Sequence, residues 1–261
     1  MPDPRIPLSE YDGPGEAVIE PSRVIAPRPG AERAVLCFFQ DAIDRLVAAR
    51  GLAPVFHLRS EIGEVPVYDV SVGDTNVLLT HPGVGAPLAA GFLEEMIAFG
   101  SRNVIACGGC GVLDSTLPVG HVLVPEIAVR DEGTSFHYLP AAREVSASPR
   151  AVAAIEMVLR ARGVPYDVVK TWTTDALYRE TRARVARRQA EGCRTVEMEA
   201  SAFFAVAQFR GIGFGQVLYA GDDVAAEEWT HRNWTRHSVR DELLEIALEA
   251  CAGMGLRTVD G

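Results

Sequence analysis

The pattern of apolar and polar positions shows two kinds of segment along the chain. Short apolar runs are typical of buried strands, and apolar residues recurring every three or four positions are typical of helices. The short runs predict strands at Val35–Phe39, Val65–Val72, Asn76–Thr80, Val104–Cys107, within Val119–Val129, at Tyr166–Trp172, in a segment closing at Val196, and at Phe214–Tyr219. The helical spacing predicts helices over Asp41–Arg50, Ala89–Phe99, Ala151–Arg162, Arg179–Ala190, Ser201–Arg210 and Ser238–Ala252.

The order of these elements predicts the fold class. Strands that alternate with helices favour a single α/β domain with a largely parallel or mixed central sheet, flanked by helices on both sides. Residues 34–261 form this predicted domain. Residues 1–33 are rich in proline, glycine and charge, so we expect an extended N-terminal arm with at most a short strand at Arg23–Ala26. Ligands of such folds bind beyond the carboxyl ends of the strands.

Composition narrows the class of protein. Of 261 residues, 48% are hydrophobic and 23% charged, which is typical of a globular domain. The net charge of −10 argues against nucleic-acid binding, although it permits a small phosphate-bearing ligand. The sequence has no apolar run long enough for a membrane span and no signal-peptide pattern. Five scattered cysteines fit reduced thiols better than a disulfide framework, so we expect a cytoplasmic protein with no membrane partner.

Two glycine-rich segments follow predicted strands. Pro82–Pro87 contains Gly-Val-Gly before a helix, and Gly108–Gly111 contains three glycines after the strand Val104–Cys107. Glycines let the backbone approach a ligand closely, and amides at a helix start favour anions. A proline-punctuated connection and a tight turn are equally good structural explanations. Cys107 and Cys110 form a CxxC pattern, but no second pair accompanies it, so a redox or zinc site is the weaker interpretation.

Carboxylates mark two further strand ends. In Val196–Ser201, Glu197 and Glu199 flank Met198 where a strand gives way to a helix. Strand alternation would put both glutamates on one face, where a carboxylate can accept both hydroxyls of a cis-diol; helix capping is the alternative. Asp222 and Asp223 end the last strand. An aspartate there can act as a general acid or simply cap a turn.

Together, these segments resemble the nucleoside phosphorylase superfamily, which includes bacterial purine nucleoside phosphorylase, uridine phosphorylase and the methylthioadenosine nucleosidases. The resemblance runs from Val35 to Ala252 and keeps the motif order. It consists of the GxGxP loop, the glycine segment, Pro118–Val124, the Val-Glu-Met-Glu-Ala segment and the strand that ends in an aspartate. The resemblance implies cleavage of the bond between a ribose and a nucleobase.

The family's roles carry over to matching positions. The resemblance implies that Glu199 binds the ribose hydroxyls, that Met198 and Val84 contact the nucleoside, and that Asp222 protonates the base, with Arg236 as its assistant. The other residues implied in substrate binding are Gly108, Gly109, Cys110, Gly111, Asp175, Leu177, Tyr178 and Glu197. The short spacing from Tyr178 to Glu197 resembles the purine enzymes, because uridine phosphorylases carry a uracil-binding insertion there.

The phosphate residues match less well. The family's Gly-Asp-Pro-x-Arg segment is replaced by Gln40–Ile43, its phosphate arginine by Ala106, and its serine or threonine by Gly109. Gly83 and Gly109 stay candidates for phosphate binding, with Arg59 near the arginine that a neighbouring subunit lends. Substitutes that the sequence allows are Arg28, Arg33 and Arg130.

Three functions follow from this resemblance. The first is phosphorolysis of a purine nucleoside to free base and ribose 1-phosphate, with inorganic phosphate as co-substrate and no cofactor or metal. The second is hydrolysis, with water in place of phosphate and Asp41 or Asp44 as candidates to orient it. The third is nucleoside binding without catalysis. The resemblance also implies a homo-oligomer, either a dimer or a hexamer of dimers.

Overall fold

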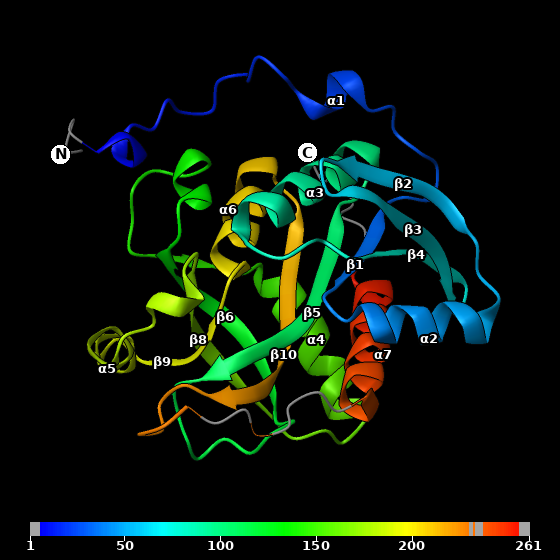
Figure 1. Cartoon of the computed structure of the whole chain (residues 1–261). Helices are drawn as coiled ribbons and strands as arrows, with labels where there is room; N and C mark the ends of the chain where they lie inside the picture. Colours follow the sequence, from blue (N-terminus) through cyan, green and yellow to red (C-terminus); the bar gives the residue numbers. More distant parts are fainter. Residues whose placement is uncertain (1–5, 230–231, 233–236, 256–261) are drawn as a thin grey trace.

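The computed structural model describes residues 6–229, 232 and 237–255, and one mixed sheet forms its centre (Figure 1). The strands are β1 (Arg33–Cys37), β2 (Pro54–Ser60), β3 (Gly63–Val72), β4 (Thr75–Thr80), β5 (Asn103–Val112), β6 (Val122–Asp131), β7 (Glu144–Ser146), β8 (Tyr166–Thr174), β9 (Cys193–Glu197) and β10 (Gly213–Asp223). The α-helices are α1 (Pro21–Val24), α2 (Gln40–Arg50), α3 (Ala86–Phe99), α4 (Pro149–Ala161), α5 (Arg182–Ala190), α6 (Ala200–Arg210) and α7 (His237–Gly253). Short 3₁₀ turns are η1 (Pro7–Ser9), η2 (Thr134–His137) and η3 (Leu177–Arg179).

The central sheet is open at one edge and closes on itself at the other. The sheet runs β10-β6-β8-β9-β5-β1-β4-β3-β2, and β10 also pairs with β5, so five of the strands close into a ring. β1 lies parallel to both β4 and β5, and β5 parallel to β10. β2, β3 and β4 form an antiparallel extension at the open edge. Apolar side chains of β5, β6, β8 and β10 meet in one cluster, among them Cys110, Leu123, Val169 and Leu218.

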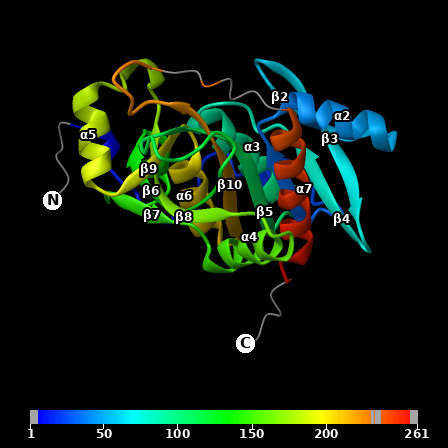
Figure 2. The same cartoon turned by 90° about the horizontal axis from the view of Figure 1, so that it is seen from below.

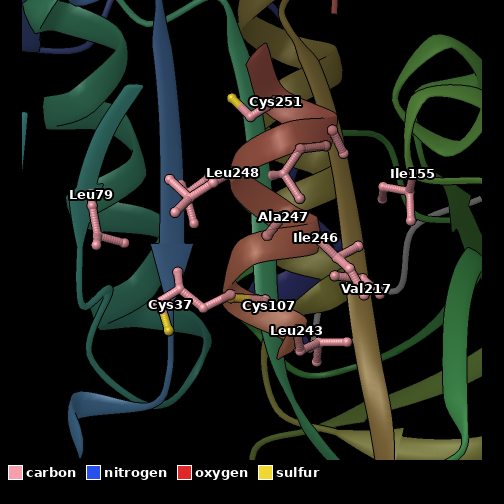
Figure 3. Close-up of a cluster of buried hydrophobic side chains, with 14 of the residues drawn as sticks. Cys37, Leu79, Cys107, Ile155, Val217, Leu243, Ile246, Ala247, Leu248 and Cys251 are labelled. Carbon is pink, nitrogen blue, oxygen red and sulfur yellow. The ribbon is translucent and has the colours of Figure 1, made fainter. Parts of the chain in front are cut away.

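Helices cover the two faces of the sheet (Figure 2). α2, α4 and α7 pack on one face, where Ile43, Ile155 and Leu248 belong to one buried cluster with strand residues such as Cys107 (Figure 3). α3 and α6 pack on the opposite face over a second buried cluster. Burial on both faces accounts for the near-continuous apolar character of β1 and β5.

Several elements differ from the sequence-based expectation. The expected strand at Arg23–Ala26 is wrong, because α1 occupies Pro21–Val24 with a proline in its first turn. β2 and β7 were not expected. The helix expected from Arg179 begins at Arg182, because Thr181 caps it by accepting the amide of Arg184. The glycine segment Gly108–Gly111, expected as a loop, lies within β5.

Candidate functional site

The ends of several strands meet where the sheet has a gap. β1 pairs with β5 only as far as Cys107, and β9 pairs with β5 only from Gly111 onward. In the described part of the chain, Gly108, Gly109 and Cys110 are therefore paired with β10 alone. Main-chain groups on their other side face this gap, which is a place where a ligand can contact β5 backbone.

The loop after β4 reaches the same place. Gly83 and Gly85 have φ angles of 76° and 92°, which side-chain-bearing residues rarely adopt. His81 fixes the start of the loop, since its Nδ1 accepts the amide of Gly83 at 2.9 Å. Gly85 then caps α3. Val84 lies between the two glycines with 64% of its surface exposed, so its side chain is available for contact.

Glu199 joins this loop to α6. Its Oε1 accepts the amide of Gly85 at 2.6 Å, and the residue is 6% exposed. The amide at the start of α3 is thus already bound to a carboxylate of the chain itself, which is the group that a helix N-terminus favours. Met198, one residue before, is half-buried.

Glu197 has different hydrogen-bond partners from Glu199. β9 ends at Glu197, so the expected alternation of a strand through Glu199 does not apply. Glu197 Oε2 accepts the amides of Glu199 and Ala200 at 2.7 and 2.6 Å, and Oε1 accepts the Thr173 hydroxyl at 2.6 Å. The carboxylate therefore caps α6, and this capping fixes the backbone that carries Glu199.

Burial changes the acidity of both glutamates. Desolvation, together with the charge of the neighbouring Glu197, raises the pKa of Glu199 to about 8. Desolvation also raises the pKa of Glu197 to about 7, although its hydrogen bonds from Thr173 and two amides oppose the shift. Each carboxyl group therefore keeps a proton at higher pH than an exposed glutamate does.

Two supporting residues were missed by sequence analysis. Thr173 Oγ accepts the amide of Ser201 at 3.0 Å while donating to Glu197. Glu132, 6% exposed, accepts the Ser201 hydroxyl at 2.9 Å and the Ser135 amide at 2.9 Å. A polar residue at a strand end cannot be recognised as part of a site from one sequence alone. Glu132 comes into contact with α6 only through the fold.

Asp222 lies at the end of β10 among other polar groups. Its Oδ2 accepts the indole N–H of Trp229 at 2.8 Å. Burial, together with the charge of the nearby Asp222, raises the pKa of Glu180 to about 7. Asp223 is separate: its Oδ1 accepts the amides of Ala225 and Ala226 at 2.9 and 3.0 Å and caps the following turn. The two adjacent aspartates thus have different surroundings, with Asp222 half-buried and Asp223 buried.

The glycines of β5 allow close packing around the gap. A Cβ atom on Gly111 would lie 2.8 Å from Val224 Cγ2 and 3.5 Å from Asp222 Oδ1. A Cβ on Gly108 would lie 3.1 Å from the ring of Phe38, and one on Gly109 would lie 3.4 Å from the ring of Tyr219. Aromatic rings therefore adjoin the first two glycines, whereas Asp222 adjoins the third.

The CxxC pair does not form a redox site. Cys107 belongs to the cluster under α7 and Cys110 to the cluster inside the strand ring. Burial raises the pKa of both thiols well above the usual value, so both stay protonated. Within the described ranges, no group of three or more His, Cys, Asp or Glu side chains is arranged to hold a metal ion.

The expected base-pocket segment follows β8. The carboxylate of Asp175 accepts the amide of Gly133 at 2.9 Å and so ties this segment to the turn after β6. Leu177 and Tyr178 are exposed by 48% and 91%. Their contact with a base stays a prediction.

Three of the candidate phosphate arginines, Arg59, Arg28 and Arg130, have partners elsewhere. Arg59 forms an ion pair with Glu64 at 2.9 Å in the exposed β2–β3 hairpin, which β1 and β4 separate from β5. Arg28 stacks on Phe56, 4.4 Å from its ring centroid. Arg130 donates to the Ser135 hydroxyl and to two carbonyls, and Arg33 lies at the start of β1, away from the strand ends. Arg236 lies outside the described residues.

Comparison with known proteins gives a consistent set of relatives. The sequence profile of the phosphorylase superfamily matches residues 32–260. The chain is 29% identical to guanosine phosphorylase of Halorubrum lacusprofundi over 165 residues, which are 62% of this chain and 68% of the relative. It is also 29% identical to a DeoD-type purine nucleoside phosphorylase of Bacillus cytotoxicus over 175 residues, 64% of this chain and 72% of the relative.

Solved structures share the fold. Uridine phosphorylase from Vibrio fischeri superposes with a TM-score of 0.70 at 23% identity, covering 87% of this chain and 97% of that one. AMP nucleosidase from Bacteroides thetaiotaomicron gives a TM-score of 0.69 at 22% identity, covering 84% of this chain and 86% of that one.

Among the described helices, none is long and apolar enough to cross a membrane.

Proposed function

Because the chain belongs to the phosphorylase superfamily, we propose that it cleaves the N-glycosidic bond of a purine nucleoside. The observation that best supports this proposal is the position of Glu199. Its side chain is buried and accepts the Gly85 amide where the loop after β4 meets α6. A carboxylate in this place can accept the 2′- and 3′-hydroxyls of a ribose. Two relatives named as guanosine and purine nucleoside phosphorylases support the preference for purines.

The proposed reaction assigns a role to each side of the site. Asp222 gives its proton to the purine while the electrons of the C1′–N9 bond pass to the base. A phosphate oxygen bonds to C1′, which yields free base and ribose 1-phosphate. Met198 and Val84 pack on the nucleoside, and the backbone of Gly83 and of Gly109 lies beside the phosphate. Arg59 of a neighbouring copy supplies positive charge. Positioning and charge stabilisation account for the catalysis.

Hydrolysis is a second candidate, and one observation favours it. Phe38 and Tyr219 adjoin Gly108 and Gly109. Arg59, Arg28 and Arg130, three of the arginines that the sequence offered for phosphate, are bound elsewhere. Water as nucleophile would give ribose in place of ribose 1-phosphate.

Base release from a panel of nucleosides tests the proposal. We expect guanosine, inosine or adenosine to be cleaved and uridine to be spared. The reaction is run in phosphate-free buffer and then with inorganic phosphate, and the sugar product is identified. Ribose 1-phosphate formed only with phosphate supports phosphorolysis, whereas ribose formed without phosphate supports hydrolysis. Binding of purine nucleosides without release of any base contradicts both.

A further inference from the structure

The segment after β10 places an indole N–H on a carboxylate of the proposed site. Trp229 Nε1 donates to Asp222 Oδ2 at 2.8 Å. The side chain is not part of the hydrophobic core, because Trp229 is 61% exposed. An exposed tryptophan that reaches back to a half-buried aspartate needs an explanation other than packing.

The backbone that carries Trp229 is held at several points. Asp223 accepts the amides of Ala225 and Ala226, which fixes the turn after β10. Arg182, at the start of α5, donates to the carbonyl of Val224 at 3.0 Å and to that of Glu227 at 2.7 Å. These bonds come from two separate elements, so the approach of Trp229 to Asp222 is built into the fold.

Asp222 faces other ionisable groups on neighbouring elements. Glu180, after η3, is half-buried and has no hydrogen bond or ion pair from its carboxylate within the described residues. Cys110, on β5, directs its thiol to the carbonyl of Tyr219. Neither group donates to Asp222, and among the described residues Trp229 is the one hydrogen-bond donor to it. Within residues 6–229, 232 and 237–255, a charge that develops on Asp222 beside Glu180 is therefore stabilised by the indole N–H.

We propose that Trp229 is the positioning residue of the general acid, an inference that rests on the proposed function. Its N–H fixes Asp222 Oδ2 and leaves Oδ1 to carry the proton toward the base. Oδ1 lies 3.5 Å from the ideal Cβ position of Gly111, on the side of the β5 glycines. The absent side chain at Gly111 keeps this side open.

The hydrogen bond acts on the proton transfer itself. As the proton moves from Oδ1 to the purine and the C1′–N9 electrons pass to the base, Asp222 becomes a carboxylate. The bond from Trp229 is neutral before the transfer and charge-assisted after it, so it strengthens along the reaction. An interaction that is stronger in the transition state than in the ground state raises kcat more than it changes KM.

Two substrates separate this role from a structural one. An ordinary purine nucleoside needs protonation for its base to leave, whereas an N7-methylated purine nucleoside already carries the positive charge and does not. For Trp229→Phe we expect kcat on guanosine or inosine to fall about tenfold with little change in KM, and kcat on 7-methylguanosine to stay within about twofold of the wild type. Trp229→His keeps a ring N–H and should recover part of the loss.

A matched control removes the same chemical group elsewhere. Trp172 Nε1 donates to Asp131 Oδ2 at 3.0 Å in the core. Trp172→Phe should lower thermal stability without changing the ratio of the two kcat values.

The outcomes distinguish the inference from the function on which it rests. Wild-type protein that releases no base from either substrate contradicts the proposed function. If the wild type is active and Asp222→Asn loses activity selectively on the ordinary nucleoside, Trp229→Phe decides the inference. A selective loss in that variant supports the positioning role. Equal rates to the wild type, or equal slowing on both substrates, overturns it while the proposed function stands.

Discussion

Glu199 and Gly85 are 114 positions apart in the sequence, yet the Glu199 carboxylate accepts the Gly85 amide at 2.6 Å. This bond links the start of α6 to the start of α3, and it couples the candidate ribose-binding group to the glycine loop. The geometry of the loop and the acidity of the carboxylate therefore depend on each other.

The first prediction concerns affinity. Glu199→Gln replaces one acceptor of the ribose hydroxyls with a neutral amide while its oxygen can still accept the Gly85 amide. Above about pH 8, where the Glu199 carboxyl is ionised, nucleoside binding should weaken by about 1.5–3 kcal/mol, the range for a hydrogen bond to a charged group. Isothermal titration with a purine nucleoside measures it. Unchanged affinity in a folded variant would remove Glu199 from the ribose site.

The second prediction concerns stability and pH. The pKa values of Glu197, Glu199 and Glu180 are raised from 4.5 to about 7, 8 and 7. Between pH 4.5 and 8 the folded chain therefore holds more protons on these groups than the unfolded chain, so their contribution to stability falls as pH rises through this window. Tm should drop between about pH 5 and pH 9. In Glu199→Gln this drop should be smaller; an equally steep drop contradicts the assignment.

The third prediction separates adjacent aspartates. Asp222→Asn should cut turnover at least about a hundredfold, the lower end of general-acid contributions, with unfolding free energy nearly unchanged. Asp223→Ala leaves the amides of Ala225 and Ala226 without their acceptor and should cost about 1–2 kcal/mol of stability. Kinetics and denaturant unfolding of both variants test this. The reverse assignment of the two effects would make Asp223 the acid.

The fourth prediction uses a pair of glycines. Gly111→Ala forces Val224 and Val196 to move, because the new Cβ would lie 2.8 and 3.0 Å from their methyl groups. We expect a loss of about 1–3 kcal/mol in unfolding free energy, together with lower kcat. Gly91→Ala is the control, since nothing lies within 4 Å of its Cβ position in α3, and it should be neutral or stabilising by up to about 1 kcal/mol.

The fifth prediction is self-association. Large apolar side chains are exposed on the N-terminal arm and on the β2–β3 hairpin, including Val18, Ile19 and Ile62. Such exposure favours a protein contact. Light scattering at micromolar concentration should give a mass of at least two chains, and an active monomer would contradict the expectation.

Much of the fold follows from local pattern. Val35–Phe39 is a continuous apolar run, and Phe214–Tyr219 is an apolar run interrupted by Gly215 and Gln216. The positions of both agree with β1 and β10 to within a few residues. β2 was missed because Pro54–Ser60 lies at the open edge of the sheet and contains a proline, a histidine and an arginine. A strand at the edge of a sheet pairs with a neighbouring strand on one side only, and it needs no continuous apolar run.

The candidate site was predicted less completely than the fold. Motif order brought Glu199, Gly85 and Asp222 to attention, since each stands in a recognisable segment. Trp229 and Glu132 do not stand in such a segment. Their roles come from side-chain contacts that the fold makes, of Trp229 with Asp222 and of Glu132 with Ser201. The glycine segment was placed in a loop because glycine weakens a strand locally, whereas pairing with β10 through Cys110 keeps it extended.

The early end of β1 has an evolutionary consequence. Because β1 leaves β5 after Cys37, one wall of the gap is main chain, and main-chain atoms are common to every residue type. A substitution changes a side chain and leaves these main-chain atoms in place, so the wall stays while the side chains around it can change. A related chain can thus exchange the side chains beside the gap, such as Phe38, and keep the backbone groups that face it.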